Sequence, residues 1–209
     1  MSKFLSSEKT ILGVSLLYIA PALWKSLSGG KMEFVLYVAV MGILLIPILV
    51  LHHRVKLHPA ALWGLSLWGL AHMCGGLVEV PESWPTAGDS RVLYNWWIIP
   101  ERLKFDQAVH AFGFGLTTWI CWQALYWSFL TQKVTIKPTF GLLTLCVAAG
   151  MGFGAFNEVV EFIATLTVPE TNVGGYINTG WDLVSNLAGS VIAAVLIRIL
   201  YSKSSKENI

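Results

Sequence analysis

Charged residues are scarce in this sequence, and their scarcity limits what kind of protein it encodes. Asp, Glu, Lys and Arg make up 12% of the 209 residues, against about 25% in an average soluble domain. Hydrophobic residues make up 55%, and the mean hydropathy is +0.64. A net charge of +2 provides no basic surface for nucleic acid, so we expect no nucleic-acid partner. The composition instead indicates a protein that lies mostly within a membrane.

Motifs of the common soluble enzymes are also missing. The sequence has no Walker loop, no glycine-rich dinucleotide fingerprint and no GxSxG nucleophile elbow. Its three cysteines, Cys74, Cys121 and Cys146, form no CxxC pair and fall in separate apolar stretches. We therefore interpret them as small core residues rather than as a disulfide or a set of metal ligands.

Six long apolar stretches organise the chain, and each approaches the roughly 20 residues that cross a bilayer. They cover residues 11–27, 34–51, 60–78, 105–130, 140–166 and 181–200. We predict an all-α fold, a polytopic bundle of about six transmembrane helices that forms a single transmembrane domain over residues 1–209. The first stretch also resembles a cleavable signal, because Ala20-Pro21-Ala22 follows a basic beginning. An uncleaved anchor helix is the interpretation that we favour.

Basic residues set the expected orientation. With the N-terminus inside, the cytoplasmic segments hold nine of the 14 Lys and Arg residues, so the positive-inside rule places both termini in the cytoplasm. The segment 79–104 then becomes a long outer loop that is rich in Trp, Tyr and Pro. Its aromatic residues suit the headgroup layer, and its length is also typical of a lid over a binding site.

Polar residues interrupt three of the apolar stretches in pairs. The pairs are Asp106 and His110, Glu158 and Glu161, and Asp182 and Asn186. A spacing of three or four residues places both members of a pair on one face of a helix. In the predicted topology all three pairs lie just below the outer face, so we expect them to converge. Ionisable groups are costly inside a membrane, which makes this convergence the candidate functional site.

Three further polar residues are additional candidates for this site. Asn157 directly precedes Glu158, Asn186 is the second member of its pair, and His72 lies on the third stretch at the same expected depth. For His72, a hydrogen bond to a neighbouring carbonyl group is an equally good interpretation. Glu79, at the end of the same stretch, is more simply an interfacial residue.

Several carboxylates beside an imidazole need a neutralising partner, because like charges a few ångströms apart disfavour joint ionisation. The candidate metal ligands, which are also the candidate catalytic groups, are Asp106, His110, Glu158, Glu161 and Asp182. Mixed carboxylate and imidazole ligands suit Zn, Mn or Fe, and a more oxygen-rich set suits Mg. Without a metal, the same groups suit general acid/base chemistry or proton coupling. A purely structural network is the third interpretation, although interhelical hydrogen bonds in membranes average well under about 1 kcal/mol.

The order of the motifs carries a family resemblance. HMCGG, FDQAVHAFGFG, NEVVEF and GYINTGWDLVSNLAGS follow one another between Ala71 and about Ala193. In this order they resemble the YjdF-like family of bacterial inner-membrane proteins and, more distantly, VanZ-like proteins. The resemblance implies a multi-pass protein of the bacterial inner membrane, without an established activity. In that family a Tyr usually precedes the Asp and a Trp often follows the second Glu, whereas this chain has Phe105 and Phe162 there and lacks both donors.

The sequence leaves three functions open, and it leaves open whether the protein is an enzyme. The first is a metal-dependent enzyme or binding site for a lipid or lipid-linked headgroup at the outer leaflet. The second is a cation- or proton-coupled transporter, although the inner halves of the last three stretches carry few polar residues. These include Thr117, Thr118, Gln123 and Ser190. The third is an accessory subunit of a larger membrane complex, and a homo-oligomer is also compatible with the sequence.

Overall fold

The computed structural model describes residues 2–207 apart from residues 31, 89, 170 and 172, and six α-helices account for most of them. The helices are α1 (Ser2–Ser28), α2 (Met32–Val55), α3 (Pro59–Leu77), α4 (Phe105–Leu130), α5 (Phe140–Thr167) and α6 (Tyr176–Glu207). Between α3 and α4 the chain forms a short 3₁₀-helix, η1 (Leu93–Asn95), and two strands, β1 (Trp97–Ile99) and β2 (Leu103–Lys104). The mostly helical fold that the sequence predicts is confirmed.

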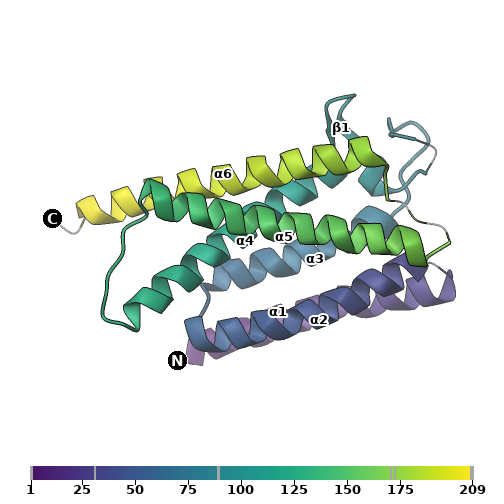
Figure 1. Cartoon of the computed structure of the whole chain (residues 1–209). Helices are drawn as coiled ribbons and strands as arrows, with labels where there is room; N and C mark the ends of the chain where they lie inside the picture. The colour runs from purple at the N-terminus through teal and green to yellow at the C-terminus, as the bar shows by residue number, and fades with distance from the viewer. Residues whose placement is uncertain (1, 31, 89, 170, 172, 208–209) are drawn as a thin grey trace.

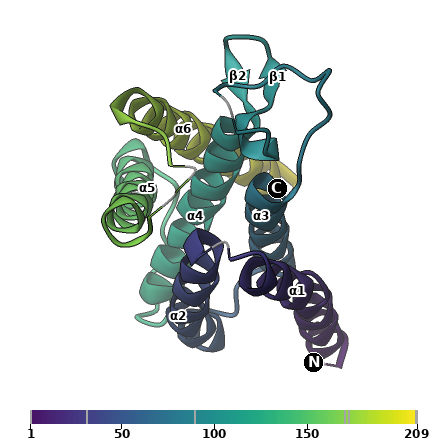
Figure 2. The same cartoon turned by 90° about the vertical axis from the view of Figure 1, so that its right-hand side faces the viewer.

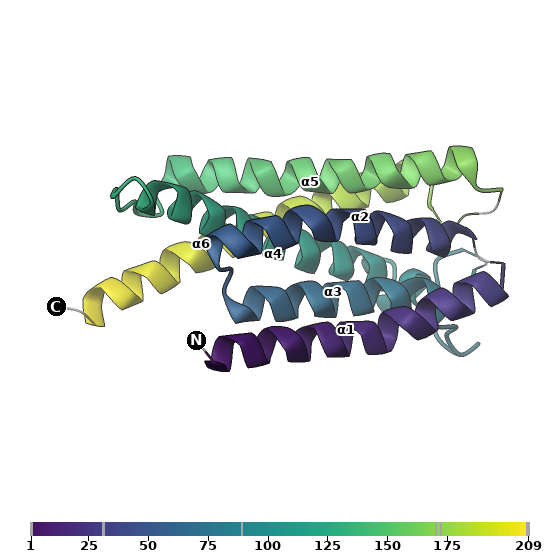
Figure 3. The same cartoon turned by 90° about the horizontal axis from the view of Figure 1, so that it is seen from below.

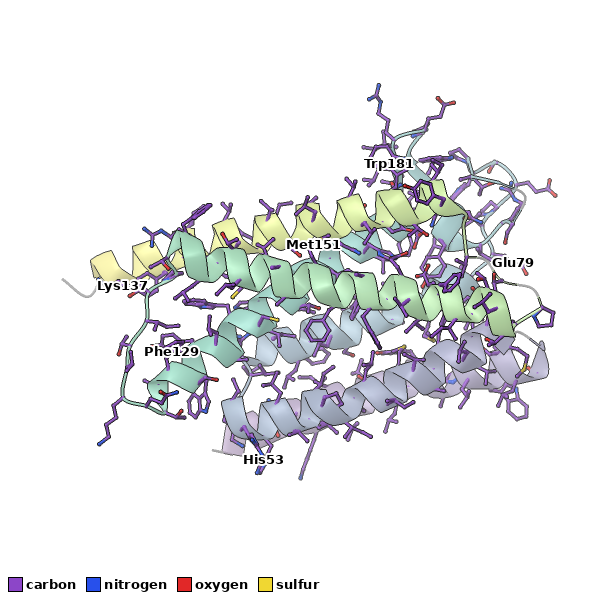
Figure 4. The ribbon with its side chains drawn as sticks, in the orientation of Figure 1. His53, Glu79, Phe129, Lys137, Met151 and Trp181 are labelled. Carbon is purple, nitrogen blue, oxygen red and sulfur yellow. The ribbon has the colours of Figure 1, made fainter. Side chains whose placement is uncertain are left out.

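Successive helices run in alternating directions, which gives the bundle two distinct ends (Figure 1). The beginning of α1, the end of α6 and the connections α2–α3 and α4–α5 lie at one end, which we call the terminal end. The connections α1–α2, α3–α4 and α5–α6 lie at the other end, which we call the loop end. The labelled residues Phe129 and Lys137 mark the terminal end, and Glu79 and Trp181 mark the loop end (Figure 4).

Helix α4 lies at the centre of the bundle. It packs against α2, α3, α5 and α6, whereas α1 packs outside against α2 and α3. The view along the bundle shows α4 with α5 and α6 on one side and α3 on the other (Figure 2), and the view from below shows it between α3 and α5 (Figure 3). Its buried residues include the polar Gln107, His110 and Thr118. A helix that faces protein on most sides tolerates such residues better than one that faces lipid.

Glycines set the distance between α4 and α6. A Cβ atom on Gly115 would lie 2.8 Å from the carbonyl oxygen of Gly189, and a Cβ atom on Gly189 would collide with the backbone of Ala111. The two backbones therefore touch, as small residues allow helices to do in membranes. We call this contact the glycine seam. Because Ala111 follows His110 and Gly189 lies three residues after Asn186, the seam aligns the polar parts of the two helices.

Polar contacts fix two helix ends at the loop end. The ammonium group of Lys25 donates to the carbonyl oxygen of Leu77 at 2.7 Å, which satisfies one of the free carbonyl groups at the C-terminus of α3. The side-chain oxygen of Gln107 accepts from the backbone N–H of Lys104 at 2.9 Å. That contact caps the beginning of α4, immediately before the candidate site.

The connection between α3 and α4 is folded rather than extended. Strands β1 and β2 pair in antiparallel fashion, and two isolated bridges join Glu79 to Val92 and Thr86 to Trp96. The rings of Trp84 and Trp96 pack with their centroids 4.7 Å apart. The segment predicted as a long outer loop is thus an ordered cap on the loop end.

Four helices are long and apolar enough to cross a membrane. The qualifying segments are Glu8–Ser28, Met32–Val55, Phe140–Thr167 and Tyr176–Tyr201, in α1, α2, α5 and α6. In the described part of the chain, α3 and α4 coincide with predicted stretches and are long enough, but they do not reach the same hydropathy. Helix α3 carries Ser66 and His72, and α4 carries Asp106, Gln107 and His110. The count of about six spans therefore stays a prediction.

Candidate functional site

The three polar pairs predicted from the sequence meet near the loop end, where α4, α5 and α6 face one another. Asp106, His110, Glu158, Glu161 and Asp182 form what we call the carboxylate cluster. Nε2 of His110 is 3.7 Å from Oδ1 of Asp106 and 3.9 Å from Oε1 of Glu161. Nδ1 of His110 is 3.7 Å from Oε1 of Glu158. Asp182 forms a second group with Asp106 and His110, in which one ligand atom per residue lies within 4.8 Å of the others.

Asn186 determines which nitrogen of His110 is available to a ligand. The amide oxygen of Asn186 lies 3.0 Å from Nδ1 of His110, and both side chains are buried. An amide oxygen only accepts hydrogen bonds, so Nδ1 carries the hydrogen and donates it. Nε2 of the neutral ring then has a free lone pair on the side of Asp106 and Glu161. Metal-binding histidines are usually oriented by a second residue in this way.

The cluster contains buried oxygen atoms that have no hydrogen-bond partner among the described residues. They are both carboxylate oxygens of Glu158 and Oδ1 of Asp182. Leaving a buried polar atom unpaired costs about 1–3 kcal/mol, and more if the group is charged.

The spacing of the cluster is longer than a hydrogen bond and short enough for a shared ion. Nε2 of His110 lies 3.7–3.9 Å from the carboxylates of Asp106 and Glu161, beyond the usual limit of about 3.2 Å for an N–H···O bond. Glu158 lies on the other side of the ring, 3.7 Å from Nδ1. Two ligands that each lie about 2.1 Å from one metal ion are at most about 4.2 Å apart. The geometry is therefore compatible with a metal-ligand set.

A lysine and an asparagine that the sequence analysis did not select border the cluster. The ammonium group of Lys104, whose side chain is 9% exposed, lies 3.6 Å from Oδ2 of Asp106 and donates to Oδ1 of Asn178. Nδ2 of Asn178 in turn donates to Oδ2 of Asp182. Asn178 reaches Asp182 because α6 begins at Tyr176 rather than near residue 181, which puts the two side chains on one helical face. An internal cation thus offsets part of the negative charge.

Helix α5 holds its acids with the help of an amide and a glycine. Nδ2 of Asn157 donates to Oε1 of Glu161 at 2.8 Å. A Cβ atom on Gly154 would lie 2.6 Å from Nδ2 of Asn186, so Gly154 provides the space that Asn186 occupies. Two of the additional candidates, Asn157 and Asn186, therefore contact members of the cluster.

His72 lies beside the cluster and is held by the cap. Its Nδ1 atom is 2.6 Å from the hydroxyl group of Tyr94, and its ring packs against Trp68 with the centroids 5.1 Å apart. Burial raises the pKa of Tyr94 well above its usual range, and the negative charges of Asp106 and Glu161 raise it further. His72 belongs to neither ligand group among the described residues, so it is a neighbour of the cluster.

A further buried acid lies on α2. Glu33 is 5% exposed, and its Oε1 atom accepts a hydrogen bond from the hydroxyl group of Tyr37 at 3.0 Å. The charges of Glu33 and Glu161 are close enough to interact. In the sequence, Glu33 stands alone at the start of an apolar stretch, where a single acid is typical of a helix N-terminus. No pairing pattern marked it as part of a site.

Toward the terminal end, buried polar side chains stop soon after the cluster. The hydroxyl groups of Thr118 and Ser190 both donate to the carbonyl oxygen of Phe114, at 2.8 and 3.3 Å, and Gly150 packs against them. Beyond them α4, α5 and α6 pack through an apolar core made of Trp122, Leu143, Cys146, Ala194 and Ile197. Among the described residues, Thr118 and Ser190 are the last fully buried polar side chains of these helices in that direction. The partly buried Gln123 follows on α4, and its side-chain oxygen accepts from the backbone N–H of His58.

On its other side the cluster borders an open cavity of about 480 Å³, which we call the outer cavity. Lys104 and Asn178 belong both to its wall and to the hydrogen-bond network of the cluster. The rest of the wall comes from the cap and from the beginnings of α4 and α6: Ala87, Trp97, Glu101, Arg102, Gln107, Ile177 and Trp181. Lys104 and Asn178 therefore lie between the carboxylates of the cluster and the outer cavity.

Fold and site together define a helical membrane protein with a buried, acid-rich site near one end of its bundle. The chain belongs to the family described as predicted membrane protein (DUF2238), whose sequence profile matches residues 10–203. No curated protein and no solved structure matches the chain significantly. The prediction of a membrane protein is confirmed, and the narrower resemblance to YjdF-like and VanZ-like proteins stays a prediction.

Proposed function

We propose that the carboxylate cluster binds a divalent metal ion and that the protein uses it to act on a lipid or lipid-linked headgroup at the extracytoplasmic leaflet. The main support is the set of buried, unpaired oxygen atoms of Glu158 and Asp182 beside His110. In the low dielectric of a bundle, a bound cation would neutralise these acids and supply the partner that each oxygen lacks.

The donor set narrows the choice of metal. One imidazole nitrogen and up to four carboxylates suit Mn, Fe or Zn, and Mg if the carboxylates dominate. Such an ion would supply Lewis-acid chemistry, which polarises a phosphoryl or carbonyl oxygen and lowers the pKa of water. A carboxylate that is not needed as a ligand remains available as a general base.

The proposal includes an orientation. The loop end faces the extracytoplasmic side of a bacterial inner membrane, six helices span it, and both termini lie in the cytoplasm. The distribution of Lys and Arg supports this orientation. The alternating course of the six helices, which brings the beginning of α1 and the end of α6 to one end, is consistent with it (Figure 1).

The alternative functions have weaker support. A transporter needs a polar route to the terminal end, and the apolar core that follows Thr118 and Ser190 weighs against one. An accessory subunit needs no unpaired buried acids, because its polar groups serve only to join helices. The unpaired oxygens of Glu158 therefore favour a ligand site over a structural network.

The test is the metal content of the purified protein. Wild-type protein is compared with a Glu158→Gln, Asp182→Asn double variant and with Glu82→Gln, which removes an exposed carboxylate of the cap. We expect about one equivalent of metal in the wild type and in the control, and a clear loss in the double variant, because ligand carboxylates must be ionised. Wild-type protein that takes up no Mn, Fe, Zn or Mg after reconstitution would contradict the proposal.

A further inference from the structure

The outer cavity has the size and the chemistry of a binding site. Its volume of about 480 Å³ lies within the range of about 300–1,000 Å³ that is usual for small-molecule sites. Its charged wall residues are Arg102 and Lys104, which are cationic, and Glu101, which is anionic and exposed. The cavity therefore carries a net positive charge beside a cluster of acids.

Lys104 has a donor to spare. An ammonium group has three N–H donors, and the described residues occupy two directions, toward Asn178 and Asp106. The side chain is 9% exposed, so its charge is poorly hydrated and gains from an anionic ligand. Arg102, exposed on the same wall, adds a planar guanidinium group, which suits the oxygen pairs of a phosphate group.

Another part of the wall is apolar and lies where α6 begins. Ile177 is 71% exposed and Trp181 is 55% exposed, and both belong to the first turns of the candidate span Tyr176–Tyr201. Trp residues at the end of a span are typical of the interface between headgroups and acyl chains. The cavity thus places cations and an interfacial aromatic surface side by side.

We propose that the outer cavity binds the phosphate group of a membrane lipid, with the phosphate between Arg102 and Lys104 and the hydrocarbon along Trp181 and Ile177. This deepens the proposed function by naming its substrate class as a lipid phosphate ester. Because the ammonium group of Lys104 lies 3.6 Å from Oδ2 of Asp106, a phosphate held by Lys104 lies beside the carboxylate cluster. Binding in the cavity itself needs no metal.

The test uses purified, metal-free protein in detergent with EDTA, so that failure of the metal site and failure of the cavity are separate results. Isothermal titration calorimetry compares dioctanoyl phosphatidate, dioctanoylglycerol and inorganic phosphate as probes. We expect phosphatidate to bind most tightly. Arg102→Gln and Lys104→Gln should each weaken it about tenfold, as expected for the loss of a charge-assisted contact. Lys137→Gln, an exposed cation at the terminal end, should leave it unchanged.

Three results would each contradict one element of the proposal: the phosphate, its lipid source or its location in the outer cavity. Equal affinity for phosphatidate and dioctanoylglycerol would overturn phosphate recognition. Equal affinity for phosphatidate and inorganic phosphate would support the phosphate site and overturn the lipid as its source. Equal weakening by Lys137→Gln would show an unspecific charge effect and overturn the assignment to the cavity. Thermal unfolding of the Arg102→Gln protein checks that this exposed substitution leaves the fold intact.

Discussion

The amide oxygen of Asn186 lies 3.0 Å from Nδ1 of His110, across the glycine seam between α4 and α6. Because this contact fixes the hydrogen on Nδ1, it leaves Nε2 as the nitrogen that faces Asp106 and Glu161. Asn186 thus sets which nitrogen of the only imidazole in the cluster has a free lone pair.

We expect Asn186→Leu to weaken metal binding by about 10–100-fold, the usual effect of losing a residue that orients a ligand. Leu has the same branching as Asn, with bulkier methyl groups, and offers no acceptor to Nδ1 of His110. Competition with a fluorescent chelator measures the affinity. Asn186→Asp, which keeps an acceptor at that position, is the control and should retain binding. Unchanged affinity in the Leu variant would show that Asn186 does not orient His110.

Two glycines on α5 provide a matched pair of substitutions. A methyl group on Gly154 would press on Asn186, whereas one on Gly152 would meet nothing within 4 Å. We expect Gly154→Ala to cost about 1–3 kcal/mol of stability, as overpacking does, and to reduce metal affinity with it. Gly152→Ala should change neither thermal unfolding in detergent nor metal binding. Equal behaviour of the two variants would contradict the packing described at Asn186.

Lys104→Gln should strengthen divalent metal binding. The ammonium group beside Asp106 repels an incoming cation, and its removal strengthens binding by at least about 1 kcal/mol, or about fivefold, which is the repulsion of two unit charges about 4 Å apart in water. Calorimetric titration with Mn²⁺ measures the change. The metal-free variant should also unfold at a lower temperature, because the acids lose their internal cation. A lower metal affinity in this variant would mean that Lys104 assists the metal rather than competing with it.

We expect the folded protein to lose stability at alkaline pH because of Tyr94. Burial and the neighbouring acids raise the pKa of its hydroxyl group in the folded protein. The neutral hydroxyl group therefore makes its full contribution to stability when the pH is below the tyrosine pKa of the unfolded chain, about 10. The contribution is lost as the pH rises from there toward the folded pKa. The test measures unfolding temperatures between pH 8 and pH 11, a range that includes the unfolded pKa of about 10. These temperatures should fall less steeply with pH for Tyr94→Phe than for the wild type. Identical slopes would rule out Tyr94 as a source of alkaline sensitivity.

Cysteine labelling tests the proposed orientation. Glu82→Cys places a thiol in the exposed cap at the loop end, and Lys137→Cys places one at the terminal end. A membrane-impermeant maleimide should label intact spheroplasts at position 82 and should label position 137 only after permeabilisation. The reverse pattern would invert the topology and place the carboxylate cluster on the cytoplasmic side.

The residues of the carboxylate cluster could be predicted from the sequence because the helical repeat depends only on residues three or four positions apart. Pairs at i, i+3 and i, i+4 fix which side chains share a face, so Asp106 and His110 point the same way wherever their helix lies. Their convergence with Glu158 and Asp182 needed only a common depth, which alternating helices supply. The structure brings all of these residues together, although their chemical role stays a prediction.

The neighbours that the sequence analysis missed lack such a pattern. Tyr94 lies in the cap, where no periodicity relates its position to His72 on α3. Lys104 directly precedes α4, and in the sequence such a position is typical of a charged residue at the membrane interface. Asn178 had a usable signal, since it lies four residues before Asp182, but placing the beginning of α6 near residue 181 left it outside the helix. Helix ends are the least certain part of such a prediction, and this one carried a site residue.

The glycine seam makes one wall of the site rigid and leaves another adjustable. Along Gly115 and Gly189 the α4 and α6 backbones touch without intervening side chains, so the separation of His110 from Asp182 is set by the main chain. Helix α5 instead meets α6 through a side chain, because Asn186 of α6 packs against Gly154. If the proposed metal site is real, a larger or smaller ion would be accommodated mainly by Glu158 and Glu161 on α5, because the separation of α4 and α6 is fixed by their backbones.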